Sequence, residues 1–372
     1  MAGVIVPFFL TWGGISLSEM MMLQAWFVFS IFLFEVPTGT IADYFGRKHS
    51  MIAAGFVGML GCLMYLIKPD FWLFAIGETL WAIGATLVSG ADEALIYDSL
   101  KKMKKEKTSK KVLGRFQSWG LAGMLVAAPV GSIAAGMYGL PFPFLMTACS
   151  FLASGLLAFT LIEPRFKKKK HEESMRYWNI LKTGLRYFKN HKELKILAFD
   201  TISIGALAAL IFWVFQIRLT ELEFPVAYFG FVHMAWLVVE ILVVTNFGLL
   251  EMLAGSKRNY LFLSALIPGV GFILTAYVDY VPLLILILIL VGSFAYTRPF
   301  LFNHYMHKYI PSRQRATVMS TISMLRNFVR GGIYLVMAVT MKASLAASLV
   351  VIGVAILVCA TVSKVEEDML LD

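Results

Sequence analysis

Eleven apolar runs, each close to the length of a helix that crosses a bilayer, constrain this chain more than any other feature. A membrane-spanning helix needs about 20 apolar residues, whereas the strands of a membrane barrel are about half as long and alternate in polarity. The runs are Met21–Thr38, Met51–Ile67, Phe71–Tyr97, Val112–Met137, Phe142–Ile162, Ile196–Ile217, Ala227–Leu250, Tyr260–Val278, Pro282–Phe302, Ala316–Met341 and Leu345–Val362. A hydrophobic share of 59% also excludes an ordinary soluble domain. The sequence therefore predicts an all-α polytopic membrane protein.

A shorter apolar segment, Met1–Leu10, opens the chain and ends at Thr11-Trp12-Gly13-Gly14. It lacks the basic start and the small-residue cleavage site of a signal peptide. We interpret it as a first transmembrane helix without its cytoplasmic half, as a fragmentary or misassigned start would produce. With this segment, the prediction becomes twelve helices.

The positions of the charges predict how the chain is oriented. The net charge is +10, and most of the 33 Lys and Arg residues lie at the C-terminus or in connections from an even-numbered to an odd-numbered span. The opposite connections hold only Lys68, Arg218 and Lys342. Because positive loops stay inside, we expect a multi-pass protein of the cytoplasmic membrane with its C-terminus in the cytoplasm. This placement explains the basic charge without a nucleic-acid partner.

The longest polar stretch, residues 163–195, predicts the division of the chain. It separates an N-terminal six-helix half, residues 1–162, from a C-terminal six-helix half, residues 196–372. The stretch contains a run of four lysines and apolar residues at helical spacing with basic residues between them. This pattern favours an amphipathic helix on the cytoplasmic membrane surface; the alternative is a solvated linker.

The two halves also repeat weakly. Gly248 and Gly255 keep the seven-residue spacing of Gly39 and Gly46, again between two spans. Met252 stands where the first copy has an acid, so the second copy keeps the glycines and loses the charge. Such degenerate repeats are typical of transporters built from two halves around a central cavity.

The loop Gly39–Lys48 has the spacing G-x-x-x-D-x-x-G-R-K and resembles the signature loop between helices 2 and 3 of the major facilitator superfamily. The segments 34–39, 89–101 and 298–320 are similar to those of a little-characterised bacterial and archaeal branch, which resembles drug and metabolite exporters. The resemblance covers essentially the whole chain. It implies two pseudo-symmetric six-helix halves that transport a solute by alternating access.

The resemblance further implies that this loop is a conformational latch at the cytoplasmic ends of the two halves in the outward-open state. Asp43 would then face the start of helix 11, near residues 312–317. Tyr44 replaces a residue that is usually basic in the family, so the latch would rely more on Arg47. The expected latch residues are Gly39, Asp43, Gly46, Arg47, Asp92, Glu93 and Arg115, with Arg47 and Arg115 as partners of the two acids at 92 and 93. The alternative role of the loop is that of a topology anchor only.

Ionisable residues inside spans are costly and are functional candidates by default. The candidates for proton coupling or substrate contact are Glu35, Glu78, Asp200, His233, Glu240, Arg298, Arg326 and Arg330. Glu78 lies mid-span where drug-exporting branches usually have arginine, and it is either a proton carrier or a hydrogen-bonded structural acid. We expect Arg326 and Arg330 to pair with acids of neighbouring helices, and His233 to be a packing residue.

Several aromatic and amide side chains are candidates for lining a cavity for a flat apolar solute. They are Trp26, Trp119, Trp213, Gln216, Trp236 and Tyr296. The alternative is that these side chains pack or face lipid. The segment Ala127–Gly131 partly resembles a signature associated with antiporters and adds weak support for export.

The leading functional prediction is a secondary transporter, an antiporter that exports a small amphipathic molecule in exchange for protons. The alternatives are a proton-coupled importer of a polar metabolite and a non-transporting, degenerate member of the family. The sequence has no nucleophile–base set and no P-loop, and His304-x-x-His307 is only a weak ligand pair. We therefore expect a monomer that is not an enzyme and that uses no cofactor or metal.

Overall fold

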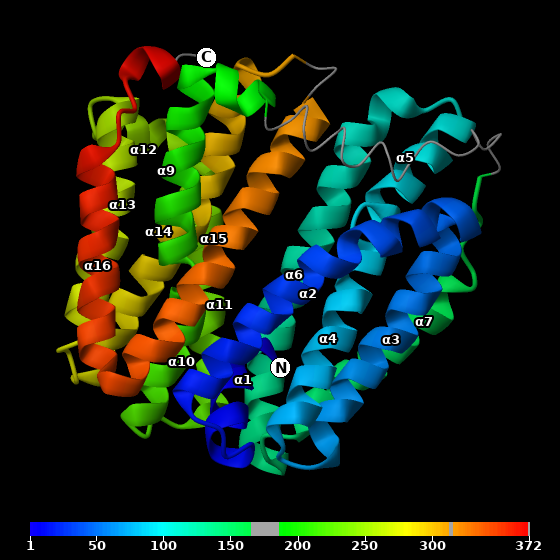
Figure 1. Ribbon diagram of the computed structural model, residues 1–372, viewed down its shortest axis with the longest axis horizontal. Helices are drawn as coiled ribbons and strands as arrows, with labels where there is room; N and C mark the ends of the chain where they lie inside the picture. The colour runs from blue at the N-terminus through cyan, green and yellow to red at the C-terminus, as the bar shows by residue number, and fades with distance from the viewer. Residues whose placement is uncertain (165–185, 312–314, 371–372) are drawn as a thin grey trace. The chain divides into compact units, whose positions relative to one another are not determined.

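The computed structural model describes residues 1–164, 186–311 and 315–370, including all their side chains except those of Val36, Asp43 and residues 315–317. The chain divides into two compact units, Met1–Tyr177 and Trp178–Asp372 (Figure 1). The boundary falls inside the segment 163–195 that the sequence predicts as a linker. The amphipathic helix expected there lies mostly outside the described residues.

Every regular element in the described ranges is helical, which confirms the predicted all-α class. The longer helices of the N-terminal unit are α2 (Leu17–Phe45), α3 (Arg47–Ile67), α4 (Phe71–Val88), α5 (Ala91–Lys102), α6 (Ser109–Tyr138) and α7 (Phe142–Ala158). Three short helical segments precede them, η1 (Ala2–Val4), α1 (Ile5–Pro7) and η2 (Phe8–Trp12). The helices of the C-terminal unit are α9 (Lys192–Ala208), α10 (Ile211–Glu221), α11 (Phe229–Thr245), α12 (Phe247–Leu253), α13 (Lys257–Thr275), α14 (Val281–Lys308), α15 (Arg315–Ala343) and α16 (Leu345–Val362).

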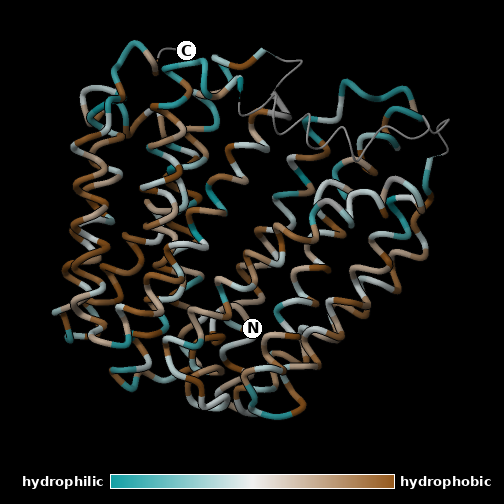
Figure 2. Tube along the Cα trace, viewed as in Figure 1, coloured by the Kyte–Doolittle hydropathy of each residue, from teal (hydrophilic) through white to brown (hydrophobic). Residues whose placement is uncertain are grey.

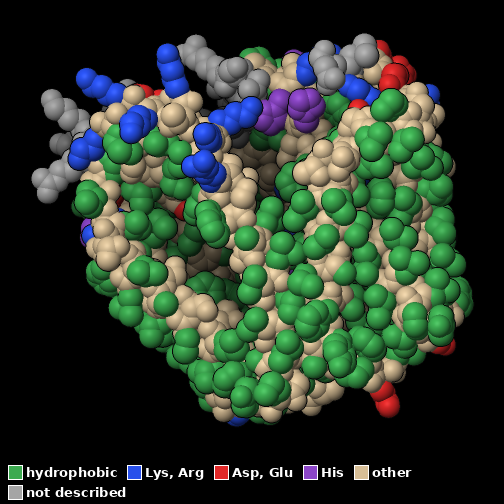
Figure 3. Space-filling model, turned by 180° about the vertical axis from the view of Figure 1, so that it is seen from behind, with side chains coloured by type: hydrophobic (Ala, Val, Ile, Leu, Met, Phe, Trp, Pro, Cys, Tyr) green, Lys and Arg blue, Asp and Glu red, His purple; other side chains and the backbone are tan. Residues whose placement is uncertain are grey.

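Ten helices of the described residues are long and apolar enough to cross a membrane. Two shorter apolar segments, Ala2–Trp12 and Phe142–Ala158, coincide with the first and sixth predicted spans. Hydrophobic residues run along the helices and hydrophilic ones gather toward their ends (Figure 2), and hydrophobic side chains cover much of the sides (Figure 3). The protein is therefore a multi-pass α-helical membrane protein, whereas the count of twelve spans stays a prediction.

Glycines in the left-handed region set two helix boundaries that differ from the predicted ones. Helix α2 continues to Phe45, so Gly46 alone, with a φ of 104°, separates α2 from α3. The expected loop Gly39–Lys48 is therefore mostly helical. Gly90, with a φ of 73°, interrupts the predicted fourth span and separates α4 from α5. Only glycine adopts such angles readily, which explains why the helices end there.

The N-terminal unit is built around α3, which packs against α4 and α7, while α2 packs against α4. Helices α3 and α7 approach closely because Gly55 faces Gly155, where an added Cβ would meet backbone atoms. The fully buried rings of Phe8, Tyr65 and Phe74 fill the end of the unit that holds the loop before α4.

Asp70 begins α4 and lies between two spans. Its Oδ1 accepts hydrogen bonds from the backbone N–H groups of Leu73 at 3.1 Å and Trp72 at 3.0 Å. The bond from Leu73 above all, with a smaller contribution from Lys68, lowers the pKa of the Asp70 carboxyl. Asp70 therefore acts as a charged N-cap at neutral pH.

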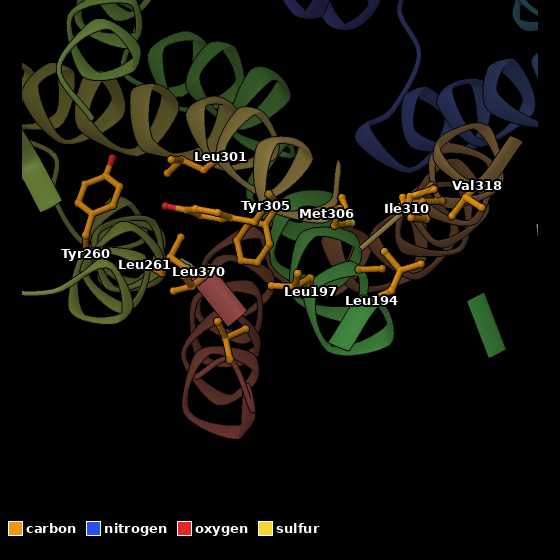
Figure 4. Packing of buried hydrophobic residues seen from close by; sticks show 14 residues of the cluster. Leu194, Leu197, Tyr260, Leu261, Leu301, Tyr305, Met306, Ile310, Val318 and Leu370 are labelled. Carbon is orange, nitrogen blue, oxygen red and sulfur yellow. The ribbon is translucent and has the colours of Figure 1, made fainter. Parts of the chain in front are cut away.

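The C-terminal unit repeats this plan. Helix α13 packs against α14 and α16, and α9 packs against α14, α15 and α16. Gly269 of α13 and Gly353 of α16 meet as the glycines of α3 and α7 do. At one end of the unit, Leu194 and Leu197 of α9 join Met306 of α14 in a buried hydrophobic cluster (Figure 4). This cluster borders Arg298, whose guanidinium donates to the carbonyl of Leu261 and lies over the ring of Phe302.

Candidate functional site

Glu78 is a buried carboxyl near the middle of α4. Its side chain is 1% exposed, and Nε2 of Gln24 in α2 donates a hydrogen bond of 3.0 Å to its Oε1. The other polar neighbour is the buried phenol of Tyr65. Among the described side chains no Lys or Arg forms an ion pair with Glu78. A carboxyl with neutral partners can gain or lose a proton without breaking an ion pair, so Glu78 is suited to carry one.

Asp200 and Arg298, two candidates from the sequence, are partners of each other. Nε and Nη2 of Arg298 donate to Oδ1 of Asp200 at 3.0 and 2.6 Å, and both side chains are 2% exposed. Oδ2 of Asp200 accepts a hydrogen bond of 2.8 Å from Ser363, which follows α16. Nη1 of Arg298 donates to the carbonyl of Leu261 and to Oγ of Ser264, both at 2.5 Å. This network joins α9, α13, α14 and the end of α16, so Asp200 is held by a cation, unlike Glu78.

Arg326 and Arg330 of α15 lie one turn apart and have buried Nε atoms that find no hydrogen-bond partner in the described part of the chain. Nη2 of Arg326 makes one long bond of 3.4 Å, to Oγ of Ser323 in its own helix. The expected pairing with acids of neighbouring helices is not observed among the described side chains. The phenol of Tyr296 interacts electrostatically with Arg330 and with Glu240 of α11. The two guanidinium groups therefore remain available for an anion.

The tryptophan candidates are buried in the C-terminal unit and exposed in the N-terminal unit. Trp213 and Trp236 are buried, Nε1 of Trp213 donates to the Tyr334 hydroxyl at 3.2 Å, and the rings of Trp236 and Tyr296 lie 5.1 Å apart. These rings come from α10, α11 and α14 of the C-terminal unit, whose helix α15 carries the arginine pair. The candidates of the N-terminal unit, Trp26 and Trp119, are 43% and 78% exposed.

The remaining deep candidates differ in their surroundings. His233 is 3% exposed and is surrounded by the rings of Phe212, Phe215 and Trp236, as a packing residue would be. Gln216 is fully buried in α10, and its Nε2 donates to the carbonyl of Phe212. Glu35 has an exposed side chain in α2, and Glu240 is half-buried in α11.

Gly46 of the motif loop lies next to a hydrogen-bonded cap at the start of α3. Oε1 and Oε2 of Glu163, which follows α7, accept hydrogen bonds of 2.8 and 3.3 Å from the backbone N–H groups of Arg47 and Lys48. The Arg47 side chain pairs with Asp98 of α5 and donates to the carbonyl of Ala94 at 2.7 Å. The cap thus joins α3, α5 and the end of α7.

The C-terminal unit contains the same device. Glu367, which follows α16, accepts hydrogen bonds of 3.0 and 2.8 Å from the backbone N–H groups of Lys257 and Arg258 at the start of α13. Gly255 precedes them with a φ of 82°, as Gly46 does before α3. The weak glycine repeat of the sequence therefore corresponds to a repeated structural feature.

The other expected latch residues lie as follows. Glu93 accepts a hydrogen bond of 3.2 Å from Nε2 of Gln117, and Asp92 accepts one of 2.7 Å from the backbone N–H of Glu93. The expected partner of these acids, Arg47, pairs with Asp98 instead, and Arg115 is exposed. Gly39 lies inside α2, whereas the side chain of Asp43 and those of residues 312–317 lie outside the described set.

Four residues that bond to the candidate site residues were not predicted from the sequence: Gln24, Asp98, Glu163 and Ser363. Asp98 lies in a segment that the sequence singled out, and Glu163 follows an apolar run directly, so both carried a local signal. Gln24 and Ser363 carried none. Within the described residues, no group of three His, Cys, Asp or Glu side chains is placed to hold a metal ion.

Residues 1–333 match the Major Facilitator Superfamily, which is nine-tenths of the chain. The chain belongs to the major facilitator superfamily. Among curated proteins, it is 26% identical over 127 residues to the probable vesicular acetylcholine transporter-B of Danio rerio. It is 28% identical over 130 residues to an uncharacterized transporter of Buchnera aphidicola subsp. Schizaphis graminum. These matches cover 34% and 35% of this chain, and only 25% and 32% of the length of the two relatives.

Solved transporter structures share the fold over nearly the whole chain. A mutant of the nucleoside transporter NupG superposes with a TM-score of 0.79 at 14% identity, covering 97% of this chain and 93% of that one. A POT family transporter in complex with 5-aminolevulinic acid gives a TM-score of 0.72 at 14% identity, covering 100% and 93%. At this identity the likeness shows the fold alone. Membership of the superfamily indicates a membrane transporter of a small solute.

Proposed function

We propose that this facilitator exports a small amphipathic molecule in exchange for protons, by alternating access of a central site. Glu78 carries the proposal, because it is a buried carboxyl in a membrane span whose polar partners are neutral. A carrier must bind a proton on one side of the membrane and release it on the other. Asp200 is less suited to this task, since its carboxylate is held by Arg298 and Ser363.

The chemistry of the C-terminal unit supports an amphipathic solute with a negatively charged group. Arg326 and Arg330 offer guanidinium groups that lack acidic partners among the described side chains. The nearby ring of Tyr296, tilted against that of Trp236, provides a surface for an apolar ring. A carboxylate or phosphate is the natural partner for paired guanidinium groups.

We further propose that the loop around Gly46 acts as the latch that the family resemblance implies. The cap formed by Glu163 and the pair between Arg47 and Asp98 support it, because they fix the orientation of α3 and α5 at this loop. The contribution of Asp43 rests on the resemblance.

The second candidate function is proton-coupled import of a polar metabolite. The arginine pair favours this alternative, because a more highly charged site suits a more polar solute. A degenerate, non-transporting member is the third alternative. Vesicles with pH gradients of opposite orientation separate these alternatives. An antiporter moves the solute in the direction opposite to the proton flow, and a symporter moves it in the same direction.

The test is transport by the full chain in proteoliposomes with an imposed pH gradient and a pH-sensitive dye inside. A panel of aromatic carboxylates and their neutral amides would identify the solute. Glu78→Gln should then abolish gradient-driven movement while leaving solute binding intact. Glu240→Gln and Glu35→Gln serve as controls. Undiminished gradient-driven transport by Glu78→Gln would reject Glu78 as the carrier.

A further inference from the structure

A cavity of about 340 Å³ lies in the C-terminal unit, away from the arginine pair of α15. It is bounded by α9, α13, α14 and the end of α16. Its lining residues are Asp200, Arg258, Asn259, Leu261, Phe262, Arg298, Ala360, Thr361, Ser363 and Val365. The proposed transport reaction assigns no role to this cavity.

One cation at the cavity, Arg258, has no acidic partner among the described side chains. The carboxylate of Asp200 is compensated by Arg298 and by the hydroxyl of Ser363. Arg298 uses four of its five N–H donors on Asp200, Leu261 and Ser264, and keeps one. The guanidinium of Arg258 is exposed and forms no ion pair with the described side chains. The side chains that line the cavity therefore comprise two cations, Arg258 and Arg298, and one anion, Asp200, while the carboxylate of Glu367 is engaged by the backbone at the start of α13.

The start of α13 does not itself provide the binding groups. Glu367 already accepts hydrogen bonds from the backbone N–H groups of Lys257 and Arg258. The available donors are side chains, namely the Arg258 guanidinium and the second N–H of the Asn259 amide, whose first N–H bonds to Ala254. A planar guanidinium with an adjacent amide suits the oxygens of a phosphate group.

The surface around the cavity is apolar, as expected for contact with lipid rather than for the wall of an aqueous channel. Phe262, Val358 and Val362 are 43%, 53% and 59% exposed along the outer surfaces of α13 and α16. In a membrane such apolar side chains contact acyl chains. The cavity lies at the ends of these spans, at the level expected for head groups, and the positive-inside pattern predicts that this end faces the cytoplasm. Basic side chains at this level attract anionic lipids.

We propose that this cavity binds the phosphate group of an anionic phospholipid, with Arg258 as the principal contact. The acyl chains would then lie along the surface of α13 and α16, which pack closely through Gly269 and Gly353. The head group would lie beside the pair of Asp200 and Arg298, which joins four helices of the unit. Binding there would stabilise the unit whatever the solute is.

The experiment uses the purified full chain in detergent with two probes, phosphatidylglycerol in mixed micelles and inorganic phosphate. Binding is measured by native mass spectrometry and by the shift in unfolding temperature. Arg258→Gln should weaken phosphatidylglycerol binding about tenfold. Lys192→Gln, the same charge change at an exposed position of α9 in the same unit, should leave it unchanged.

The outcomes separate the possible sources of the phosphate group. Binding of phosphatidylglycerol but not of inorganic phosphate, lost in Arg258→Gln, supports a lipid site. Arg258-dependent binding of inorganic phosphate alone overturns the lipid and assigns the cavity to a soluble anion. Equal binding by Arg258→Gln and Lys192→Gln overturns the site itself. Both variants change exposed side chains, so failure to fold does not confuse the comparison.

Discussion

Two buried acids in membrane spans have opposite surroundings, and this contrast separates their roles. Glu78 has the amide of Gln24 and a phenol beside it, whereas Asp200 has a guanidinium and a hydroxyl. Removing a charge from a buried ion pair leaves its partner uncompensated. Removing the charge of an acid with neutral partners leaves no uncompensated charge in the protein. The same conservative substitution should therefore act on stability at one site and on coupling at the other.

Asp200→Asn is expected to destabilise the protein by about 3–5 kcal/mol, because Arg298 would lose its anion inside the unit. Glu78→Gln should cost less than about 1 kcal/mol, since an amide can still bond to Gln24. Thermal unfolding of both purified variants in the same detergent measures the difference. Equal destabilisation would contradict the contrast drawn between the two acids.

Gly46 is a residue where any side chain should be costly. Its φ of 104° is strained for other residues, and a Cβ there would collide with the carboxylate of Glu163. We expect Gly46→Ala to destabilise the N-terminal unit by about 1–3 kcal/mol. Gly114→Ala is the matched control, because Gly114 lies in helix α6 with open space around it. A helical glycine replaced by alanine should be neutral or slightly stabilising.

At the scale of elements, each unit caps the start of one helix, α3 or α13, with an acid that follows α7 or α16. Glu163 caps α3 from the end of α7, and Glu367 caps α13 from the end of α16. Each carboxylate satisfies two backbone N–H groups and meets the positive end of the helix dipole. The cap thus fixes the pair α3–α7 or α13–α16 at one end, and the facing glycines fix it further along.

Glu163→Ala should cost about 1–2 kcal/mol of stability, because two N–H groups lose their acceptor. Glu367→Ala should cost a similar amount in the other unit. Glu106→Ala, at an exposed acid before α6, should change the unfolding temperature little. Hydrogen exchange at the first turns of α3 and α13 shows whether each effect is local. Unchanged exchange at Arg47 and Lys48 in Glu163→Ala would contradict the assignment of the cap.

The elements were largely predictable from the sequence, whereas their ends and partners were not. The length and hydropathy of the apolar runs predict spans, since the bilayer imposes both. The sequence places Gly90 inside one predicted span, because a single glycine in a sequence does not show whether its φ is positive. Glu163 bonds to a residue 116 positions away and Ser363 to one 163 positions away. Such pairs depend on helix packing, on which local periodicity carries no information.

At the scale of the whole molecule, the repeated plan of the two units is the property that a transporter of this superfamily requires. Each unit has a glycine turn, an acid cap and a close glycine pair, although Met252 replaces the acid in the second loop. The chemistry, by contrast, is divided. The neutral-partnered carboxyl lies in the N-terminal unit, and the arginine pair lies in the C-terminal unit.

The orientation of the chain is the whole-molecule property on which the transport direction and the lipid site both depend. The positive-inside pattern predicts that residues 101–111 face the cytoplasm and that the loop between α13 and α14 faces outward. Cysteine labelling tests this in a background from which Cys62, Cys149 and Cys359 have been replaced. In sealed, right-side-out cells an impermeant thiol reagent should leave Ser109→Cys unmodified.

Tyr277→Cys is the matched position at the other end of the spans, because Tyr277 is 70% exposed and lies in the loop between α13 and α14. It should react fully in intact cells, and Ser109→Cys should react only after the membrane is permeabilised. Labelling of Ser109→Cys in intact cells with protection of Tyr277→Cys would invert the orientation. The Lys- and Arg-rich connections would then face outward, and the argument that places the phosphate site in the cytoplasmic leaflet would fail with them.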